Sequence, residues 1–391
     1  MKILVIGGGM AGLTYAIVAC KNGYEVTLVE RNSRVGKKLA TTGNGKCNIG
    51  NAKVDASCYN SSAIVRRVLK EISVDEYTQF LTSCGIFTYA DNDGRMYPIS
   101  DSASSVVDCL RHQFAKFGGR LLVDTQITSI NKIGAIYQIT IGLGVYEFDK
   151  VVLACGSGSQ AEKPNIANIL PQGVFTPLAP SLVPVKVRNM DGRLNGLRAR
   201  AKVSLYDDDT LLGCESGEIQ FKDYGLSGIC VLNLSAIIAR RQVLRKSGNY
   251  HFVVDLVPHV NEWDLEEIIH ERMIDGEQDK LFYGILHNKI AEYIVKRTGV
   301  GASALDLAHM AKNLWFEFDR LLDWSMSQVT AGGIAEGYLD HSSLALSNGV
   351  VAIGEVLNVD GICGGNNLYF ASASALYTFT KEQRNNAYRF R

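Results

Sequence analysis

The sequence predicts an α/β protein built on a Rossmann-type sheet, and three observations near its N-terminus support this. An apolar run at residues 3–6 precedes a glycine-rich turn, and a helix-compatible segment follows at residues 13–21. A second apolar run, residues 26–29, then ends in Glu30. Strand, glycine turn, helix, strand and acid in this order form the dinucleotide-binding fingerprint.

Each glycine of the turn has a distinct predicted task. Gly7 permits the tight turn, Gly9 lets the backbone approach a pyrophosphate, and Gly12 lets the helix pack close to the strand. The N-terminus of the helix supplies N–H groups and a partial positive charge for the phosphates. Glu30 stands where a carboxylate would accept hydrogen bonds from a ribose.

Length and composition place the chain among multidomain globular proteins. Its 391 residues exceed what one hydrophobic core usually serves, so two or three domains are expected. Lys+Arg and Asp+Glu are both 40, which gives a net charge of zero. This balance argues against nucleic acid or an anionic membrane as an obligate partner and favours a small-molecule substrate.

The cysteines indicate a reduced, cytoplasmic protein. There are nine, no two have CxxC spacing, and none pairs with a histidine cluster, so neither a disulfide framework nor a metal site is expected. The apolar N-terminus imitates a secretory signal, but its glycines suit a turn better. No other window offers about 20 uninterrupted apolar residues, so no membrane span is expected.

A long polar stretch, Arg31 to Asn51, follows Glu30, and long structureless segments in compact domains are usually functional or disordered. Within it, the segments 36–39 (GKKL) and 42–48 (TGNGKCN) resemble the signature of a bacterial three-domain flavoprotein family. That family includes aminoacetone oxidase-type enzymes and flavin reductases of bile-acid metabolism. The resemblance implies an FAD beside this loop. The family pattern has Gly where this chain has Asn44 and Arg where it has Lys46, so an ammonium group here replaces a planar guanidinium group that could make a bidentate contact.

Further blocks extend the resemblance. Residues 93–101 and 217–228 are similar to family blocks, and residues 350–360 with 364–368 resemble its second FAD-binding block. The resemblance implies an FAD-binding domain from residues 1–182 and 321–391, a β-rich insert at 183–258 and a helical insert at 259–320.

Local patterns predict the elements of the FAD-binding domain. Helices are expected at residues 61–70, 73–84 and 103–116, the second opened by a capping box between Ser73 and Glu76, and strands at 120–123 and 151–154. A meander of three short strands at residues 126–148 is typical of FAD-binding folds of the glutathione-reductase type. Residues 156–161 imitate a second fingerprint, but Pro164 would interrupt the helix that must follow, so we reject it.

The inserts show two different patterns. Short strand-like runs at 183–187, 199–206, 218–221, 228–234 and 250–256 predict the β-rich part. Helices are predicted from Trp263, in a run from 281 to 294 and at 303–318, and a final helix at 369–381.

The fingerprint and the resemblance together predict a set of FAD-binding residues drawn from both ends of the chain. They are Gly7, Gly9, Met10, Ala11, Gly12, Glu30, Arg31, Lys38, Leu39, Thr42, Asn44, Gly45, Asn48, Ile127, Cys155, Gly156, Gly354, Glu355, Asp360, Gly365, Asn366 and Asn367.

Catalytic side chains are harder to find, because bound FAD would carry the redox step itself. Cys47 and Cys363 are candidate redox thiols and Tyr97 a candidate proton donor, although each also fits an ordinary packed residue. Lys46 and Arg95 could bind an acidic substrate or the FAD phosphates.

Several functions remain open at this stage. The leading hypothesis is an FAD-dependent oxidoreductase that reduces a C=C or C=O bond with electrons from NADH or NADPH, which would visit non-covalent FAD transiently. An oxidase of amines or α-amino ketones that uses oxygen is the alternative. A tRNA-modifying flavoprotein and a non-enzymatic flavin-binding protein are further alternatives.

Overall fold

The computed structural model describes residues 1–60, 62–156, 169–276 and 280–389. The chain divides into two compact units. Unit 1 comprises residues 1–178 and 329–391, and unit 2 comprises residues 179–328. Each unit is described by itself.

A seven-stranded sheet is the centre of unit 1, in the order β19-β20-β21-β10-β1-β2-β6. Strand β1 pairs in parallel with β2 on one side and with β10 on the other. Residues 3–6 of β1 are buried, because a central parallel strand is covered on both faces. The strands are β1 (Lys2–Ile6), β2 (Glu25–Val29), β6 (Arg120–Leu122), β10 (Lys150–Leu153), β19 (Leu339–Asp340), β20 (Ala345–Leu346) and β21 (Val351–Ala352).

Unit 1 also contains two small antiparallel sheets and the short strand β18 (Val329–Ala331). The meander consists of β7 (Ile127–Ile133), β8 (Ile136–Ile141) and β9 (Gly144–Phe148), as the alternating pattern predicts. The other sheet has the order β3-β5-β4, formed by β3 (Gly50–Asn51), β5 (Arg95–Pro98) and β4 (Thr88–Ala90).

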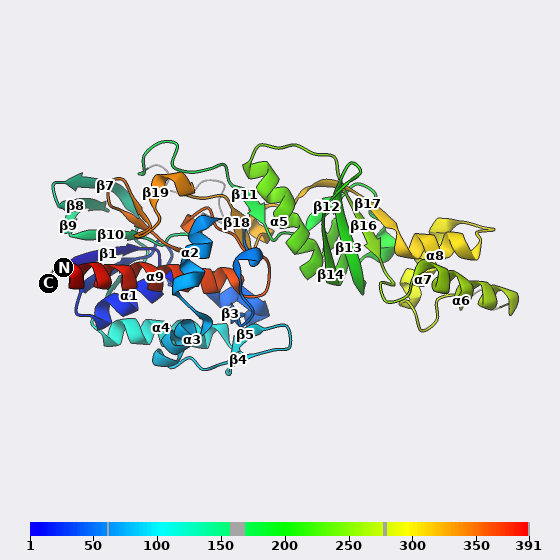
Figure 1. Cartoon of the computed structure of the whole chain (residues 1–391), viewed down its shortest axis with the longest axis horizontal. Helices are drawn as coiled ribbons and strands as arrows, with labels where there is room; N and C mark the ends of the chain where they lie inside the picture. Colours follow the sequence, from blue (N-terminus) through cyan, green and yellow to red (C-terminus); the bar gives the residue numbers. More distant parts are fainter. Residues whose placement is uncertain (61, 157–168, 277–279, 390–391) are drawn as a thin grey trace. The chain divides into compact units, whose positions relative to one another are not determined.

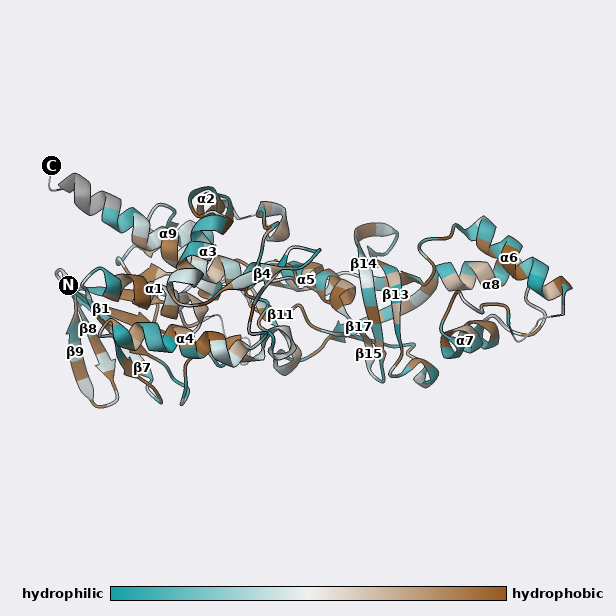
Figure 2. Ribbon diagram, turned by 90° about the horizontal axis from the view of Figure 1, so that it is seen from below, coloured by the Kyte–Doolittle hydropathy of each residue, from teal (hydrophilic) through white to brown (hydrophobic). Residues whose placement is uncertain are grey.

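The helices of unit 1 include the first and the last of the described chain. They are α1 (Met10–Lys21), α2 (Ala63–Glu71), α3 (Val74–Ser83), α4 (Ala103–Lys116) and α9 (Asn366–Arg389). Helices α1 and α9 lie side by side (Figure 1), and the Tyr15 and Phe379 rings meet edge to face at 5.9 Å. Helix α1 is hydrophobic along most of its length (Figure 2), which fits its place between the sheet and α9. The predicted capping box of α3, between Ser73 and Glu76, is confirmed.

Unit 2 is organised around a closed six-stranded barrel, β12-β15-β14-β13-β16-β17. Its strands are β12 (Val185–Val187), β13 (Arg198–Asp207), β14 (Thr210–Lys222), β15 (Gly225–Ser227), β16 (Tyr250–Asp255) and β17 (Leu314–Leu321), and β11 (Ala179–Ser181) precedes them. Its helices are α5 (Ile229–Val243), α6 (Glu262–Ile274), α7 (Asn288–Thr298) and α8 (Ala304–Lys312).

Two predictions for this unit are wrong. Residues 228–234, predicted as strand-like, belong to α5, which begins after Gly228 at φ +100°. A short apolar run does not distinguish a strand from a buried helix, and tertiary packing decides. The helix predicted at 303–318 ends at Lys312, and β17 follows with alternating burial at Leu314 and Phe316. This strand closes the barrel.

Two helix limits also differ from prediction. Helix α7 begins only at Asn288, and the final helix begins at Asn366 rather than at 369. None of the described helices is both long and apolar enough to span a membrane.

Candidate cofactor site

The first glycine turn is as tight as its sequence predicts. Gly7 has φ +107° and donates its N–H to Val29 O at 2.8 Å. A Cβ atom at Gly7 would lie 2.5 Å from Ala154 O, and one at Gly12 would lie 1.9 Å from Gly7 O. The close packing of α1 on the turn therefore requires glycine at position 12, and the approach of the chain after β10 requires it at position 7.

Gly9 and the start of α1 form the part of this turn that is open. A Cβ at Gly9 would meet no protein atom within 4 Å. The first bond that closes the helix runs from Leu13 N to Gly9 O at 3.0 Å, so the N–H groups of Met10, Ala11 and Gly12 precede it. Space above a glycine and N–H groups at a helix N-terminus fit a phosphate group.

Glu30 is buried and points back to the glycine turn. Its Oε2 accepts from Gly8 N at 2.8 Å, and its Oε1 accepts from Asn32 N at 2.8 Å and from Asn32 Nδ2 at 2.6 Å. An ionised carboxylate offers about four acceptor sites, so capacity remains for ribose hydroxyls. Gly8 and Asn32 are contacts that we did not predict. Gly8 lies within the fingerprint, whereas no local signal singles out Asn32.

The chain returns to this region after β10. A Cβ at Gly7 would lie 2.6 Å from Cys155 Cα, so Cys155 lies directly against the turn. Burial raises the pKa of the Cys155 thiol to about 12, with smaller electrostatic effects from Arg31, which lowers it, and Glu30, which raises it. Gly156 follows at φ +65°. The rejected second fingerprint continues at residues 157–161, outside the described residues.

Ile127 and Arg31, both predicted to bind the cofactor, differ in burial. Ile127 is buried at the start of β7, just after Thr125, whose N–H donates to Glu30 O at 3.0 Å. Arg31 is exposed. The structure therefore brings Ile127 near Glu30 through the backbone.

The predicted flavin loop contains a 3-10 helix, η1 (Leu39–Gly45), which packs on α4. It is tied to the first turn by Gly36 N, which donates to Gly8 O at 2.8 Å. Leu39 is buried, and Thr42 Oγ1 donates to Leu39 O at 2.7 Å. Gly45 is exposed. Asn44 lies within η1, and its side chain is outside the described part of the chain.

Lys38 and Glu355 join this loop to the second glycine block across 317 residues of sequence. The Lys38 Nζ to Glu355 Oε2 distance is 2.5 Å. The other oxygen of Glu355 accepts from Thr330 N at 2.9 Å. Thr330 is a site residue that no pattern in the sequence indicates.

Gly354 brings the second block against the first. It has φ +72°, and its N–H donates to Ser374 Oγ at 2.9 Å. A Cβ at Gly354 would lie 2.8 Å from the Cβ of Ala11, in the first turn of α1. The two glycine blocks therefore meet at the N-terminus of α1.

A second junction lies at the N-terminus of α9. Asn48, with its amide oriented to satisfy its neighbours, accepts from Gly365 N at 3.1 Å and donates to Gly50 O at 2.9 Å. A Cβ at Gly365 would lie 2.1 Å from Gly50 O. Tyr59 OH donates to Asn366 O at 2.7 Å. The loop after the first block thus holds the start of the last helix in place.

Two more predicted residues stabilise the turn before α9. The amide of Asn367 accepts from Gly361 N and donates to Gly361 O, both at 2.8 Å. Asp360 is buried, and its carbonyl accepts from Asn60 N at 3.0 Å. These hydrogen bonds hold the backbone of the second block at Asp360 and Gly361.

The three candidate catalytic residues lie around the second junction. Cys47 is fully buried at φ +62°, and burial raises the pKa of its thiol to about 11. Such a thiol is a poor nucleophile near neutral pH, which favours a packing role. Tyr97 is half-buried and stacks on Tyr89, with ring centroids 5.9 Å apart. Cys363 is half-buried immediately before Gly364.

Arg95 and Lys46 are both occupied by carboxylates. Arg95 Nε and Nη2 each lie 2.7 Å from an acid, Asp91 and Asp93 respectively. Lys46 Nζ lies 3.4 Å from Asp101. These pairs reduce the capacity of either cation to bind an acidic substrate.

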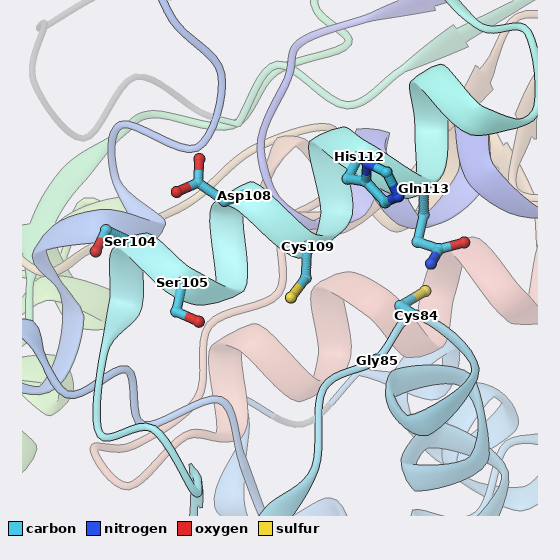
Figure 3. A pocket seen from close by; sticks show the side chains of 8 residues that line it. All are labelled: Cys84, Gly85, Ser104, Ser105, Asp108, Cys109, His112 and Gln113. Carbon is cyan, nitrogen blue, oxygen red and sulfur yellow. The ribbon is translucent and has the colours of Figure 1, made fainter.

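A hollow of about 550 Å³ lies elsewhere in unit 1, between Gly85 and α4 (Figure 3). It is lined by Cys84, Gly85, Ser104, Ser105, Asp108, Cys109, His112 and Gln113. None of the predicted cofactor-binding residues lines it.

Comparison with known proteins identifies the family. The model of the HI0933-like protein Rossmann domain matches residues 1–380. The chain belongs to this family. It is a flavin-dependent oxidoreductase of an FAD-binding Rossmann family, as the loop at residues 36–48 indicates.

Several relatives align with this chain along nearly its whole length. The 3-dehydro-bile acid delta(4,6)-reductase of Clostridium scindens is 29% identical over 95% of this chain and 97% of its own. The ribosomal RNA dihydrouridine synthase of Haemophilus influenzae is 24% identical over 95% of this chain and 96% of its own. Among solved structures, the 3-ketosteroid-delta4-(5alpha)-dehydrogenase of Rhodococcus jostii covers 97% of this chain and 96% of its own at 13% identity, with a TM-score of 0.45.

Proposed function

We propose that the protein reduces a C=C or C=O bond of a small organic molecule with electrons from NADH or NADPH, through non-covalently bound FAD. One observation carries the direction of the reaction. Of the three relatives that align along 95% of the chain, one is named as a reductase and two as dihydrouridine synthases, and both names denote the addition of hydrogen to an unsaturated molecule.

The described residues fit the cofactor that this reaction needs. FAD, when bound, supplies the hydride-transfer chemistry. The open N-terminus of α1 would bind its phosphates, and Glu30 its ribose. The N-terminus of α9, which begins at Asn366, would face negative charge with the positive end of its dipole.

The two thiols of this region would pack within the fold rather than act as nucleophiles. The pKa of the Cys47 thiol is raised to about 11 and that of Cys155 to about 12, both chiefly by burial. Neither thiol is ionised near neutral pH, which makes a thiolate-based step unfavourable. A reaction carried mainly by the cofactor suits this arrangement.

Anaerobic stopped-flow mixing of the yellow holoprotein with NADPH or NADH tests the proposal. We expect rapid bleaching of the flavin absorbance with one of the two nucleotides, followed by reoxidation by an unsaturated ketone. No bleaching by either nucleotide, together with hydrogen peroxide release during amine turnover in air, would identify an oxidase instead.

Reduction of an RNA base is a second candidate, because the Haemophilus influenzae relative is a ribosomal RNA dihydrouridine synthase. The zero net charge weighs against it, since RNA binding depends on neutralising phosphates. Loss of dihydrouridine from ribosomal RNA after deletion of the gene, restored by the wild-type protein, would establish this function in place of the first.

A further inference from the structure

The hairpin of β4 and β5 carries a row of exposed apolar side chains on one face. Tyr89 pairs with Tyr97, and Ile99 N donates to Phe87 O at 2.9 Å just beyond the strand ends. Because side chains alternate along a strand, these four residues and Arg95 share one face. Phe87 is 56% exposed, Tyr89 43% and Ile99 68%.

The opposite face of the hairpin is packed. Met96 is buried there, and a Cβ at Gly50 would lie 3.3 Å from its sulfur. Pro98 is buried as well. One face of the hairpin is thus packed against the rest of unit 1. The exposed row of side chains lies on the other face of the same element. Contiguous exposed apolar side chains commonly mark a binding surface.

The row begins at the cofactor site. A Cβ at Gly43, in η1, would lie 3.7 Å from Cε1 of Tyr97. A Cβ at Gly364, just before α9, would lie 3.9 Å from Cγ of Arg95. The face therefore starts against both segments predicted to contact the flavin and extends outward through the stacked Tyr97 and Tyr89 to Ile99.

Charges along the row do not suit an anion. Arg95 is paired with Asp91 and Asp93, and Lys46 is paired with Asp101, which also accepts from Tyr89 OH at 2.8 Å. A third cation, Lys53, donates from its Nζ to Asn92 O at 2.9 Å in the turn between the two strands. Because Lys46, Lys53 and Arg95 are each engaged by protein groups, this face suits a neutral apolar molecule better than a polyanion such as RNA.

We propose that Phe87, Tyr89, Tyr97 and Ile99 form the platform on which the substrate docks, and that the substrate is a neutral, flat, apolar fused-ring molecule. The inference rests on the proposed function, because it takes this face as the entrance to the flavin. Two stacked tyrosine rings with an interplanar angle of 29° offer flat apolar surface that stays in place. Ile99 and Phe87 extend it away from the reacting end.

Equilibrium dialysis of the FAD-loaded protein with progesterone, a neutral steroid enone, tests the platform without requiring turnover. We expect binding by the wild type, and a rise in Kd of about tenfold in Tyr89→Ala and in Phe87→Ala, as for truncation of a central aromatic contact. The control is Leu143→Ala, which removes a fully exposed apolar side chain from the turn after β8 and should leave the Kd unchanged. The flavin content of each variant is measured alongside to show that the fold is retained.

Two results would overturn the platform. One is an unchanged Kd in both aromatic variants, or no progesterone binding by the wild type. The other is tighter binding of an oligouridylate than of progesterone, lost in the same variants. Because the dialysis does not involve NADPH, failure of flavin bleaching would refute the proposed reductase while leaving the binding result to decide on the platform.

Discussion

The two glycine blocks of unit 1 differ in how far along the chain the atoms lie that exclude a side chain at each glycine. In the first block, the neighbours that exclude a side chain lie partly in the same strand–helix unit, as Gly7 O does for Gly12, and partly farther along the chain, as Ala154 O does for Gly7. In the second block they are distant in sequence. Gly354 meets Ala11, and Gly365 meets Gly50 O. The first block keeps the spacing of the fingerprint and can be recognised by it, whereas the atoms that confine Gly354 and Gly365 lie more than 300 residues away.

This difference separates two kinds of contribution to the cofactor site. The first block makes a local binding element, an open helix N-terminus above a tight turn. The second block closes the site by fastening the start of α9 and the loop at residues 36–48 to that element. Substitutions in the two blocks should accordingly differ in what they disturb.

The largest effect is expected for Gly12→Ala. Its Cβ would lie 1.9 Å from Gly7 O, a backbone atom that cannot move without shifting α1. We expect a loss of unfolding free energy on the order of 3 kcal/mol or more, together with loss of FAD. Urea denaturation and the flavin content after purification measure both.

Gly9→Ala is the matched control within the same turn. Its Cβ would meet no protein atom, so stability should change by less than about 1 kcal/mol while FAD affinity falls. Equal stability of Gly12→Ala and Gly9→Ala would contradict our account of the first block.

Gly365→Ala tests the second block. Its φ of +91° and the 2.1 Å approach to Gly50 O both oppose a side chain. We expect a cost of about 2 kcal/mol and weaker FAD binding, because the start of α9 must shift. Gly142→Ala, also at positive φ but with open space around it, should be destabilising without affecting FAD. A normal FAD affinity in Gly365→Ala would show that this junction does not shape the cofactor site.

Lys38→Met and Glu355→Gln separate cofactor binding from stability. The pair is partly exposed, so its loss should cost no more than about 1 kcal/mol of stability. FAD affinity should nevertheless fall severalfold in each variant, since the pair joins the flavin loop to the second block. Fluorescence titration of apoprotein with FAD measures this. In Arg193→Met, which breaks an exposed pair with Asp191 in unit 2, FAD affinity should be unchanged.

The smallest effect is expected for Cys47→Ser at neutral pH. Burial raises the pKa of the Cys47 thiol from 9.0 to about 11. The folded state therefore retains a proton that the unfolded chain loses, and this contribution to stability is fully present below pH 9 and lost as pH rises towards about 11. Cys47→Ser should weaken that part of the pH dependence and leave the rate of flavin reduction by NADPH unaltered.

Iodoacetamide at pH 8 provides an independent measurement for the same thiol. Cys47 should stay unmodified in the folded protein while the exposed Cys214 reacts. Rapid modification of Cys47 with loss of flavin reduction would support the prediction that Cys47 is a redox thiol.

The sequence predicted the Rossmann unit well where the interactions are local. The close packing at Gly12, the capping box of α3 and the meander depend on near neighbours in the chain, whereas the turn at Gly7 is also confined by Ala154. It failed at α5 and β17, where a short apolar run adopts the conformation that the barrel around it requires. The partners of the site, Thr330 and Tyr59, have no local signature, because only folding brings them to Glu355 and Asn366.

The sequence by itself therefore determined the fold class, the first glycine block and, through the loop at residues 36–48, the flavoprotein family. Only the tertiary structure decided how the two blocks meet, that Lys38 pairs with Glu355, and that the face carrying Tyr89 and Tyr97 begins at the predicted flavin loop. The physical reason is the range of the interactions. A turn or a cap is specified within a few residues, whereas a contact between residues 300 positions apart exists only once the sheet and α9 have assembled.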